Sequence, residues 1–357
     1  MMKATMDDGK RERTVVRVAN RLILAASVLL ASGQCAANAA SGPGIPSIFK
    51  PESTPADSIY GLSLLVLSVT AVIFVIVFSL IAYTVAKFRR RSSDAPEPPQ
   101  VYGSNQIETA WTVIPILIVL ILFAATTSVI HAIQDHQMPE GAIEVTAIGH
   151  QFWWEFRYPA LGVVTANELH VPVSDPSHPR PTFLTLISAD TDHSFWVPRL
   201  AGKTDLIPNR INKMWIDPHQ VGMYVGQCAQ YCGLQHAKML LRVYVDSPDG
   251  FTKWVQQEKK PAQPIDAANE GRRIFETTAC VNCHTVSGTV ADGQFGPDLT
   301  HLMSRDTIAS GAAPNTPENL KAWIQDPDAI KPGSLMPAMK LDERDLNALT
   351  AYLETLQ

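Results

Sequence analysis

The chain has 357 residues, of which 46% are hydrophobic and 18% are charged, and its formal net charge at pH 7 is −5. This length is sufficient for two or three globular or membrane units, so a single domain is not expected. The mild negative charge excludes a strongly basic nucleic-acid surface, and no nucleic-acid partner is expected.

The first residues have the order of a secretory signal. The basic stretch KRERTVVRVANR is followed by the apolar run LILAASVLLAS and by the small residues ANA at 37–39. This order predicts a signal peptide over residues 1–39. A membrane span is the alternative, but the run is shorter than the roughly 20 residues that cross a bilayer. Lipidation of Cys35 is a further alternative, although the preceding SGQ lacks the usual leucine.

Two longer apolar stretches follow, at about 59–86 and 111–130, and each is long enough to span a membrane. The basic sequence KFRRR directly follows the first stretch. Because positive residues stay on the cytoplasmic side, the loop between the two helices is expected in the cytoplasm. Residues 40–135 are therefore predicted to form an N-terminal segment and a two-helix transmembrane hairpin, with everything after about Gln134 on the periplasmic or outer face.

The remainder of the chain divides into a β-rich part and a helical part. Residues 141–246 contain short β-rich runs such as IEVTAI, TFLTLIS and LLRVYV between Pro-rich turns, which predicts a small all-β sandwich of Greek-key type. A short helix and a linker are expected over 247–267. Residues 268–357 show amphipathic helical patterns that begin with Thr, Asp or Pro, and they predict a small all-α domain.

Four cysteines beyond the signal peptide form two close pairs, Cys228 with Cys232 and Cys280 with Cys283. In an oxidising compartment two short-range disulfides are one interpretation. Each pair is also followed by a histidine at metal-ligand spacing, which a disulfide does not require. The pattern therefore favours two metal or cofactor sites.

The stretch CAQYCGLQHAKM carries four soft donors, from Cys228, Cys232, His236 and Met239. Thiolate, imidazole and thioether together suit copper. Zinc is the alternative, because two cysteines and two histidines satisfy a tetrahedral structural site, but a thioether is not a normal zinc ligand. A second histidine is expected from an earlier strand end, and His193 in TDHSFWVP is the candidate.

The sequence CVNCH is the attachment signature of a c-type haem. In such a site the thiols of Cys280 and Cys283 add to the haem vinyl groups, and His284 becomes an axial iron ligand. A thioredoxin-like redox pair is the alternative, but that pair needs a βαβ context and has no use for the histidine. The surrounding patterns are helical, which favours covalent haem attachment.

The sixth iron ligand is expected downstream of this motif. Met336 lies in KPGSLMPAMK, a Pro-bounded loop that can reach the iron, with Met339 as the alternative and Met303 assigned to the core. Methionine opposite histidine raises the haem potential, which suits an electron donor to copper.

Several of these motifs resemble cytochrome c oxidase subunit II. DHSFWVP, GKTDLIPNRIN and GQCAQYCGLQHAKM occur in the order found in that family, and the similarity covers 59 to about 245. The resemblance implies a cupredoxin sandwich with a dinuclear copper A centre, whose ligands would be two bridging thiolates, two histidines, one axial methionine and one backbone carbonyl: Cys228, Cys232, His193, His236, Met239 and Gln230. Many members carry Glu where Gln230 stands, and that Glu helps to bind magnesium, so no magnesium ligand is assigned here.

An aromatic run, GHQFWWEFRY at 149–158, holds five aromatic residues. An interfacial aromatic belt or a plain core is one interpretation. The resemblance implies that this run covers the copper site and that its first aromatic, usually Trp, receives electrons from cytochrome c. Phe152 stands at that position, so Trp153 and Trp154 are further candidates.

Glu108 lies in IETAWTVIP, at the cytoplasmic end of the second span, with Pro115 in the first turns. A carboxylate there is commonly a solvated helix-start residue favoured by the macrodipole. The resemblance implies instead that Glu108 lies at the mouth of a proton channel into subunit I.

The last part of the chain carries a second resemblance. GPDLTHLMSR and NTPENLKAWIQDPDAIKPG are similar to class I cytochrome c domains fused to oxidase subunits, over 268–357. The two resemblances imply subunit II of a caa-type haem-copper oxidase. Such a chain would have a transmembrane hairpin, a cupredoxin-like domain and a cytochrome c domain in the bacterial inner membrane.

That family implies a path for electrons. Cytochrome c or a quinol-cytochrome c reductase would donate to haem c, and the electrons would pass to copper A and then to haem a of subunit I, where oxygen is reduced and protons are translocated. Subunit III is a further expected partner, and this chain has no oxygen site of its own. An electron-delivery subunit of a nitric oxide reductase and a membrane-anchored electron shuttle are the alternatives.

Overall fold

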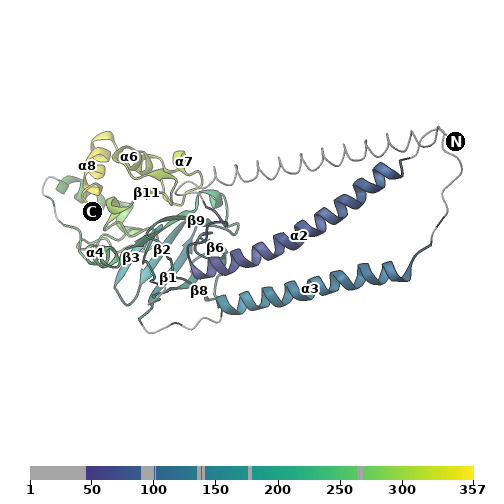
Figure 1. Ribbon diagram of the computed structural model, residues 1–357. Coiled ribbons are helices and arrows are strands. Elements are labelled where there is room, and N and C mark those ends of the chain that lie inside the picture. The colour runs from purple at the N-terminus through teal and green to yellow at the C-terminus, as the bar shows by residue number, and fades with distance from the viewer. Residues whose placement is uncertain are drawn as a thin grey trace, which may run out of the picture. The chain divides into compact units, whose positions relative to one another are not determined.

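The computed structural model describes residues 46–89, 100, 102–134, 138, 141–175, 179–263, 265 and 268–357 (Figure 1). The expected signal peptide with Cys35 lies outside these residues, as does the end of the basic sequence that follows the first span. Among the described residues, 61–129 form one compact unit, and those up to 60 and from 130 onward form the other.

The first unit consists of the greater part of two long apolar helices, α2 (Thr54–Lys87) and α3 (Asn105–Gln134). Their most apolar windows have mean hydropathies of 3.0 and 2.7, so both are long and apolar enough to cross a membrane. Both helices extend beyond the apolar stretches at 59–86 and 111–130, because polar residues continue the helix at each end. The expectation that Pro115 lies in the first turns of the second span is wrong, because α3 begins at Asn105 and Pro115 lies inside the helix.

The beginning of α2 belongs to the globular unit and is bound by Asp217, which directly follows the last strand of one sheet. One oxygen of the Asp217 carboxylate accepts hydrogen bonds from the Ser53 hydroxyl, at 2.9 Å, and from the Thr54 backbone N–H, at 2.8 Å. The other oxygen accepts from the Thr54 hydroxyl at 2.6 Å. A carboxylate at this end satisfies an orphan N–H group and complements the positive end of the helix dipole.

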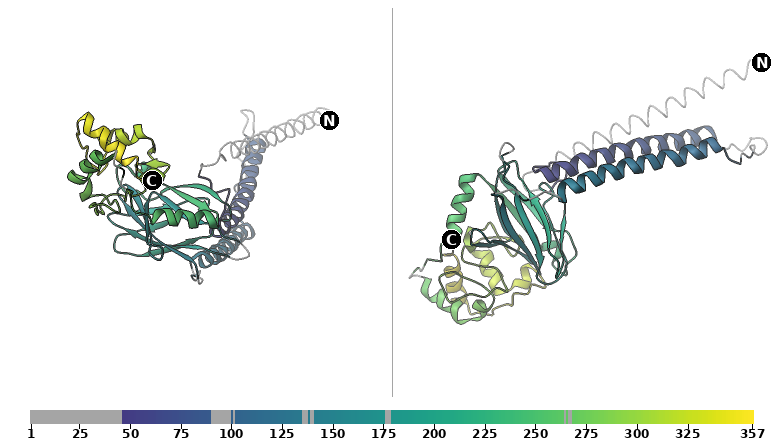
Figure 2. Two further views of the ribbon diagram at one scale, coloured as in Figure 1. Left: turned by 90° about the vertical axis from the view of Figure 1, so that its left-hand side faces the viewer. Right: turned by 90° about the horizontal axis from the view of Figure 1, so that it is seen from below.

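The globular unit contains a sandwich of two five-stranded sheets (Figure 1; Figure 2). The first has the order β3-β2-β1-β5-β8 and the second has the order β4-β10-β9-β6-β7. The pairs β1–β5 and β4–β10 are parallel and the others are antiparallel. The strand bounds are β1 (Ile143–His150), β2 (Trp153–Tyr158), β3 (Val163–Ala166), β4 (Glu168–Pro172), β5 (Thr182–Ser188), β6 (His193–Trp196), β7 (Thr204–Leu206), β8 (Asn212–Ile216), β9 (Gly222–Cys228) and β10 (Leu240–Asp246).

Alternating burial along the strands builds the sandwich core. In β5 every second residue is buried, and β10 shows the same period in the other sheet. Val145, Leu186, Phe195 and Val243 are among the fully buried side chains that meet between the sheets. The expected Greek-key sandwich is therefore confirmed.

A helix follows the sandwich directly. Helix α4 (Pro248–Glu258) begins at Ser247, whose hydroxyl accepts a hydrogen bond from the Gly250 N–H. Phe251 and Val255 on one face of α4 join the sandwich core. The first half of the segment expected as a short helix and linker is therefore packed on the β-domain.

The C-terminal domain is helical, with four α-helices, two 3-10 turns and one two-residue strand pair in the described chain. Its elements are α5 (Asn269–Thr277), η3 (Ala279–Asn282), η4 (Leu302–Ser304), β11 (Thr307–Ile308), β12 (Ala313–Pro314), α6 (Pro317–Gln325), α7 (Pro327–Ile330) and α8 (Glu343–Leu353). A further 3-10 turn, η1 (His236–Lys238), lies between β9 and β10 of the sandwich domain.

The core of the helical domain forms where α5 crosses α8. Gly271 lies so close to the Ala348 carbonyl oxygen that an added Cβ would be 1.9 Å from it, so the crossing requires glycine. The rings of Phe275 and Tyr352 lie 5.8 Å apart across the same crossing. The helical cytochrome c-like fold expected for this segment is confirmed, with the β11–β12 pair as a small addition.

Candidate metal and haem sites

Three segments of the sandwich bring soft donor atoms together. Cys228 ends β9, and the loop from there to β10 carries Cys232, His236 and Met239. Strand β6 pairs with β9 in the register Phe195↔Cys228. This pairing places the start of β6, and with it His193, beside the cysteine loop.

The donor atoms converge on the two sulfur atoms. The Sγ of Cys228 and the Sγ of Cys232 are 3.9 Å apart, and each lies near an imidazole nitrogen: Cys228 is 3.9 Å from His193 Nδ1 and Cys232 is 3.8 Å from His236 Nδ1. A disulfide has an S–S length near 2.05 Å, so these sulfurs are not bonded to each other.

Two further donors complete the cluster. The thioether of Met239 lies 3.8 Å from the Cys232 sulfur, and the Gln230 carbonyl oxygen lies 3.1 Å from the Cys228 sulfur. Two central thiols, each flanked by one imidazole and one weaker donor, fit a site in which both sulfurs are shared. This donor set fits copper, since cysteine, histidine and methionine together are its characteristic ligands.

The cluster is buried and electrostatically coupled. Met239 and His193 are 0% exposed and both cysteines are 3% exposed. The hydrogen bond between the two thiols lowers the pKa of Cys228 to about 3 against the opposing effect of burial. The same contact raises the pKa of Cys232. Both shifts therefore have the same cause, the close approach of the two sulfur atoms.

Asp190 orients His193. Its Oδ1 lies 2.7 Å from His193 Nε2, and its Oδ2 accepts the Gln151 N–H at 2.6 Å. Because a carboxylate only accepts, Nε2 of His193 carries a proton, and Nδ1, which faces Cys228, is the ring nitrogen left for a metal. Burial lowers the pKa of His193, but the hydrogen bonds with Asp190 and Cys228 raise it by a larger amount, so the net shift of the His193 pKa is upward.

The sequence pattern did not identify Asp190. Its signal is the spacing of three residues to His193 in DTDHSF, which places a carboxylate within reach of the imidazole in the turn before β6. The sequence pattern also did not identify Gly149 as a neighbour of the site. An added Cβ at Gly149 would be 2.9 Å from the His193 ring, so glycine leaves room for that ring.

The aromatic run divides between the core and the edge of the cluster. Trp154 is 0% exposed, with its ring centroid 6.2 Å from that of His193, and Phe156 is equally buried. Trp153 is partly buried and stacks on His150 at 4.3 Å. Phe152 is 8% exposed and lies against Gly233 of the cysteine loop. The three candidates for electron uptake therefore lie at different depths. Trp154 is buried beside the candidate ligand His193, and Phe152 lies against the loop that carries Cys232.

The haem motif lies at the end of the first helix of the C-terminal domain. Cys280 is in η3 and Cys283 follows it, and both thiols are free. The Nδ1 of His284 lies 2.8 Å from the Pro297 carbonyl oxygen. Since a carbonyl only accepts, Nδ1 is protonated and Nε2 is the nitrogen with a lone pair for iron. Burial lowers the pKa of His284, which favours the neutral form that binds a metal.

The two free thiols and the oriented imidazole fit a covalently attached haem. An added Cβ at Gly296 would be 2.6 Å from the His284 ring, so glycine leaves the room that this ring occupies. Met303 and Met339 are partly buried against the helical core, while Met336 is partly buried in the loop before α8. The sixth ligand therefore stays a prediction between Met336 and Met339.

Glu108 lies in the first turn of α3, where the carboxylate complements the helix dipole. This placement agrees with a helix-start residue and leaves its relation to a proton channel as a prediction. His301, by contrast, is buried and bonded to the carbonyl oxygens of Gln357 and Lys260, so it has a structural role.

The fold and the two motifs define a class of protein: a membrane-anchored chain that joins a cupredoxin-like sandwich, bearing a cysteine–histidine–methionine cluster, to a helical cytochrome c domain. Three sequence families match the corresponding parts of the chain. These are the cytochrome c oxidase subunit II transmembrane domain over 47–129, the periplasmic domain of the same subunit over 165–245, and cytochrome c over 268–357.

Curated relatives extend over most of the chain. Cytochrome c oxidase subunit 2 of Alkalihalophilus pseudofirmus is 35% identical over 316 residues, which cover 86% of this chain and 90% of that protein. Cytochrome c oxidase subunit 2 of Bacillus sp. strain PS3 is 34% identical over 340 residues, which cover 89% of this chain and 94% of that protein. The chain therefore belongs to the cytochrome c oxidase subunit II family and carries a C-terminal cytochrome c domain.

A solved structure also matches the periplasmic part. The periplasmic domain of subunit II of cytochrome oxidase from Bradyrhizobium japonicum is 28% identical, with a TM-score of 0.32, and the match covers 34% of this chain and 97% of that one.

Proposed function

We propose that this chain is the electron-accepting subunit of a terminal respiratory oxidase of caa type. It takes electrons from cytochrome c or a quinol-cytochrome c reductase through a covalently bound haem c, passes them to a dinuclear copper A centre and delivers them to haem a of subunit I. Oxygen reduction and proton translocation take place in the partner, so the chain is catalytic only within the complex.

The copper A ligands in this proposal are the six donors of the cluster. Two coppers would be held by the thiolates of Cys228 and Cys232, the imidazoles of His193 and His236, the thioether of Met239 and the carbonyl oxygen of Gln230. When bound, the two coppers supply a one-electron site. The protein's part is to bury the donors and to orient the His193 ring through Asp190.

The haem c ligands in this proposal are His284 and Met336, with Cys280 and Cys283 attached to the vinyl groups. When bound, the haem supplies a one-electron site with a high potential, because methionine opposite histidine raises it. The Pro297 carbonyl holds the His284 ring with Nε2 directed away from its hydrogen-bonded side.

Other assignments extend this proposal. Phe152, Trp153 and Trp154 are the candidates for electron uptake at the sandwich, and Glu108 is the candidate for the proton-channel mouth. The domain boundaries would be 1–39, 40–135, 141–246, 247–267 and 268–357. The copper and haem domains would lie on the periplasmic face of the bacterial inner membrane, with subunit III as a further partner.

One observation carries the proposal: five side-chain donors of copper character, two of them unbonded cysteine sulfurs, converge in the same globular unit that holds a CxxCH motif. The test is oxygen uptake by the purified complex with reduced cytochrome c, together with the near-infrared copper A band and the haem c spectrum. The proposal predicts oxygen uptake and both spectra. Reduction of nitric oxide in place of oxygen would identify a nitric oxide reductase subunit, and purification without any haem-copper partner would identify an electron shuttle.

A further inference from the structure

The cytochrome c domain and the sandwich make specific polar contacts. Two short segments of the helical domain take part, 306–311 and 330–333, and each meets a different part of the sandwich. Segment 306–311 lies along β4 and β10, and segment 330–333 lies against the loop that carries the copper A donors.

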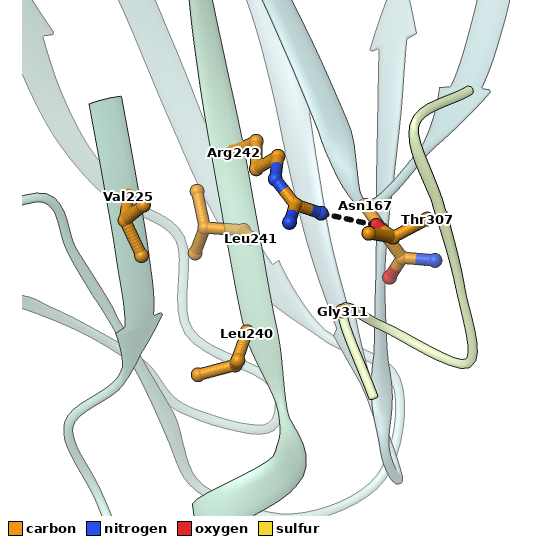
Figure 3. A pocket seen from close by; sticks show the side chains of 7 residues that line it. All are labelled: Asn167, Val225, Leu240, Leu241, Arg242, Thr307 and Gly311. Carbon is orange, nitrogen blue, oxygen red and sulfur yellow. Dashed lines mark hydrogen bonds between the residues drawn. The ribbon is translucent and has the colours of Figure 1, made fainter. Parts of the chain in front are cut away.

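The contact with β4 and β10 is built around a buried carboxylate. Glu168 is 3% exposed, and its Oε1 accepts the backbone N–H groups of Asp306, at 2.9 Å, and Thr307, at 3.2 Å. Arg242 of β10 also donates a hydrogen bond to the Thr307 hydroxyl (Figure 3). The main chains also meet, since the Leu240 N–H donates to the Ser310 carbonyl oxygen at 3.1 Å.

The contact with the copper loop is built around a buried lysine. Lys331 is 3% exposed, and its ammonium donates to the Phe152 carbonyl oxygen at 2.7 Å and to the Ala309 carbonyl oxygen at 3.0 Å. Burial lowers the pKa of Lys331 to about 7, while the nearby Cys232 opposes that effect. A lysine is almost never fully buried without such partners, so its place here is specific.

The neighbours of Lys331 connect it to the metal ligands on both sides. Gln151, which precedes Phe152, donates from its side chain to the Cys232 carbonyl oxygen at 2.5 Å. The Lys238 ammonium donates to the Ile330 carbonyl oxygen at 2.7 Å, and Gln235 donates to the Pro332 carbonyl oxygen. On the other side, Met336 follows only five residues after Lys331. The loop that carries Met336, a candidate iron ligand, is therefore hydrogen-bonded to the loop that carries the candidate copper ligands.

We propose that Lys331 is a positioning residue for electron transfer: it fixes the Met336 loop of the cytochrome c domain on the Phe152 carbonyl beside the copper loop. This inference rests on the proposed function, because it assigns a role between the two redox sites. The cytochrome c domain is then docked on the sandwich and not only tethered to it, and Glu168 makes the second buried contact from the sandwich side.

The test compares the wild-type oxidase complex with Lys331→Met and with the control Lys321→Met. Lys321 is a partly exposed lysine of α6 in the same domain, 3.9 Å from Glu343 and outside this contact. The first readout is hydrogen exchange at the Asp306, Thr307 and Leu240 amides, which bond across the contact but do not touch Lys331. The second is the rate of haem c to copper electron transfer after flash reduction of the haem.

Loss of a charged hydrogen bond is expected to lower the protection of these amides about tenfold to a hundredfold. The transfer rate should fall in the same variant, while amides inside α8 keep wild-type protection. In Lys321→Met both readouts should equal the wild type. Wild-type protection and rate in a Lys331→Met protein that retains both redox spectra would overturn the proposal.

If Lys331→Met loses its haem or copper spectrum, Glu168→Met tests the docked arrangement from the sandwich side. Methionine has a similar length but no oxygen to accept the Asp306 and Thr307 N–H groups, so protection at Leu240 and the transfer rate should both fall. Unchanged values would overturn the docked arrangement. A wild-type complex without the copper or haem c band would instead contradict the proposed function, so the two failures are distinguishable.

Discussion

Substitution of Asp190 is the most selective perturbation of the copper site, because Asp190 orients the candidate ligand His193 but is not itself a candidate ligand. Its two carboxylate oxygens serve different donors, the His193 Nε2–H at 2.7 Å and the Gln151 N–H at 2.6 Å. Burial raises the pKa of Asp190, but hydrogen bonds from His193, Gln151 and Thr191 outweigh burial and lower the pKa overall. The ionised form is therefore the one that orients His193.

The substitution Asp190→Asn keeps the size of the side chain and removes its charge. Asn offers one acceptor oxygen and one NH₂ group, so it can accept from either His193 or Gln151 but not from both. The loss of a charge-assisted hydrogen bond is worth about 1.5–3 kcal/mol, and changes in groups that orient metal ligands typically cost about 10–100-fold in metal affinity. We expect a fall of that size in copper affinity.

The assay is titration of the copper-depleted protein with copper, followed by the near-infrared band, with haem c absorbance as an internal standard. Asp192→Asn is the matched control, since Asp192 is an exposed carboxylate in the same turn. The control should bind copper like the wild type. Equal affinities for Asp190→Asn and the wild type would refute the role assigned to Asp190.

Three further substitutions have specific expected outcomes. Cys228→Ser removes a bridging donor, so the near-infrared copper band should disappear while the haem c spectrum is retained; an unchanged band would refute the copper assignment. Met336→Leu should lower the haem c midpoint potential in a redox titration, because the thioether raises it, and a wild-type potential would move the ligand to Met339. Gly271→Ala places a Cβ 1.9 Å from the Ala348 carbonyl oxygen, so it should destabilise the cytochrome c domain by at least the roughly 1–3 kcal/mol of overpacking, and an unchanged thermal unfolding midpoint would contradict the close crossing of α5 and α8.

The sequence predicted the features that depend on local pattern. The period-two burial of β5 and β10 follows from their alternating apolar residues, and the two spans follow from their length and hydropathy. The donors Cys228, Cys232, His236 and Met239 share twelve residues, so their convergence needs only one loop. His193 was predictable because a sandwich metal site needs a ligand from an earlier strand end.

Features that depend on contacts between distant segments were not predictable. The carboxylate of Asp190 acts on His193 only in the turn before β6, and the close approach of Gly271 to Ala348 requires α5 and α8 to cross. The sequence predicts only a loop at Lys331, whereas its hydrogen bond to the Phe152 carbonyl oxygen joins residues 179 positions apart. Periodicity and motif spacing report on neighbours in the chain, whereas tertiary packing decides these pairs.

The most direct measurement is the copper and covalent-haem content of the purified oxidase subunit, by elemental analysis together with the haem spectrum of the denatured chain. The account predicts two coppers for each haem that remains attached to the polypeptide. Zinc at the first site, a disulfide between its two sulfurs, or a chain without attached haem would contradict it.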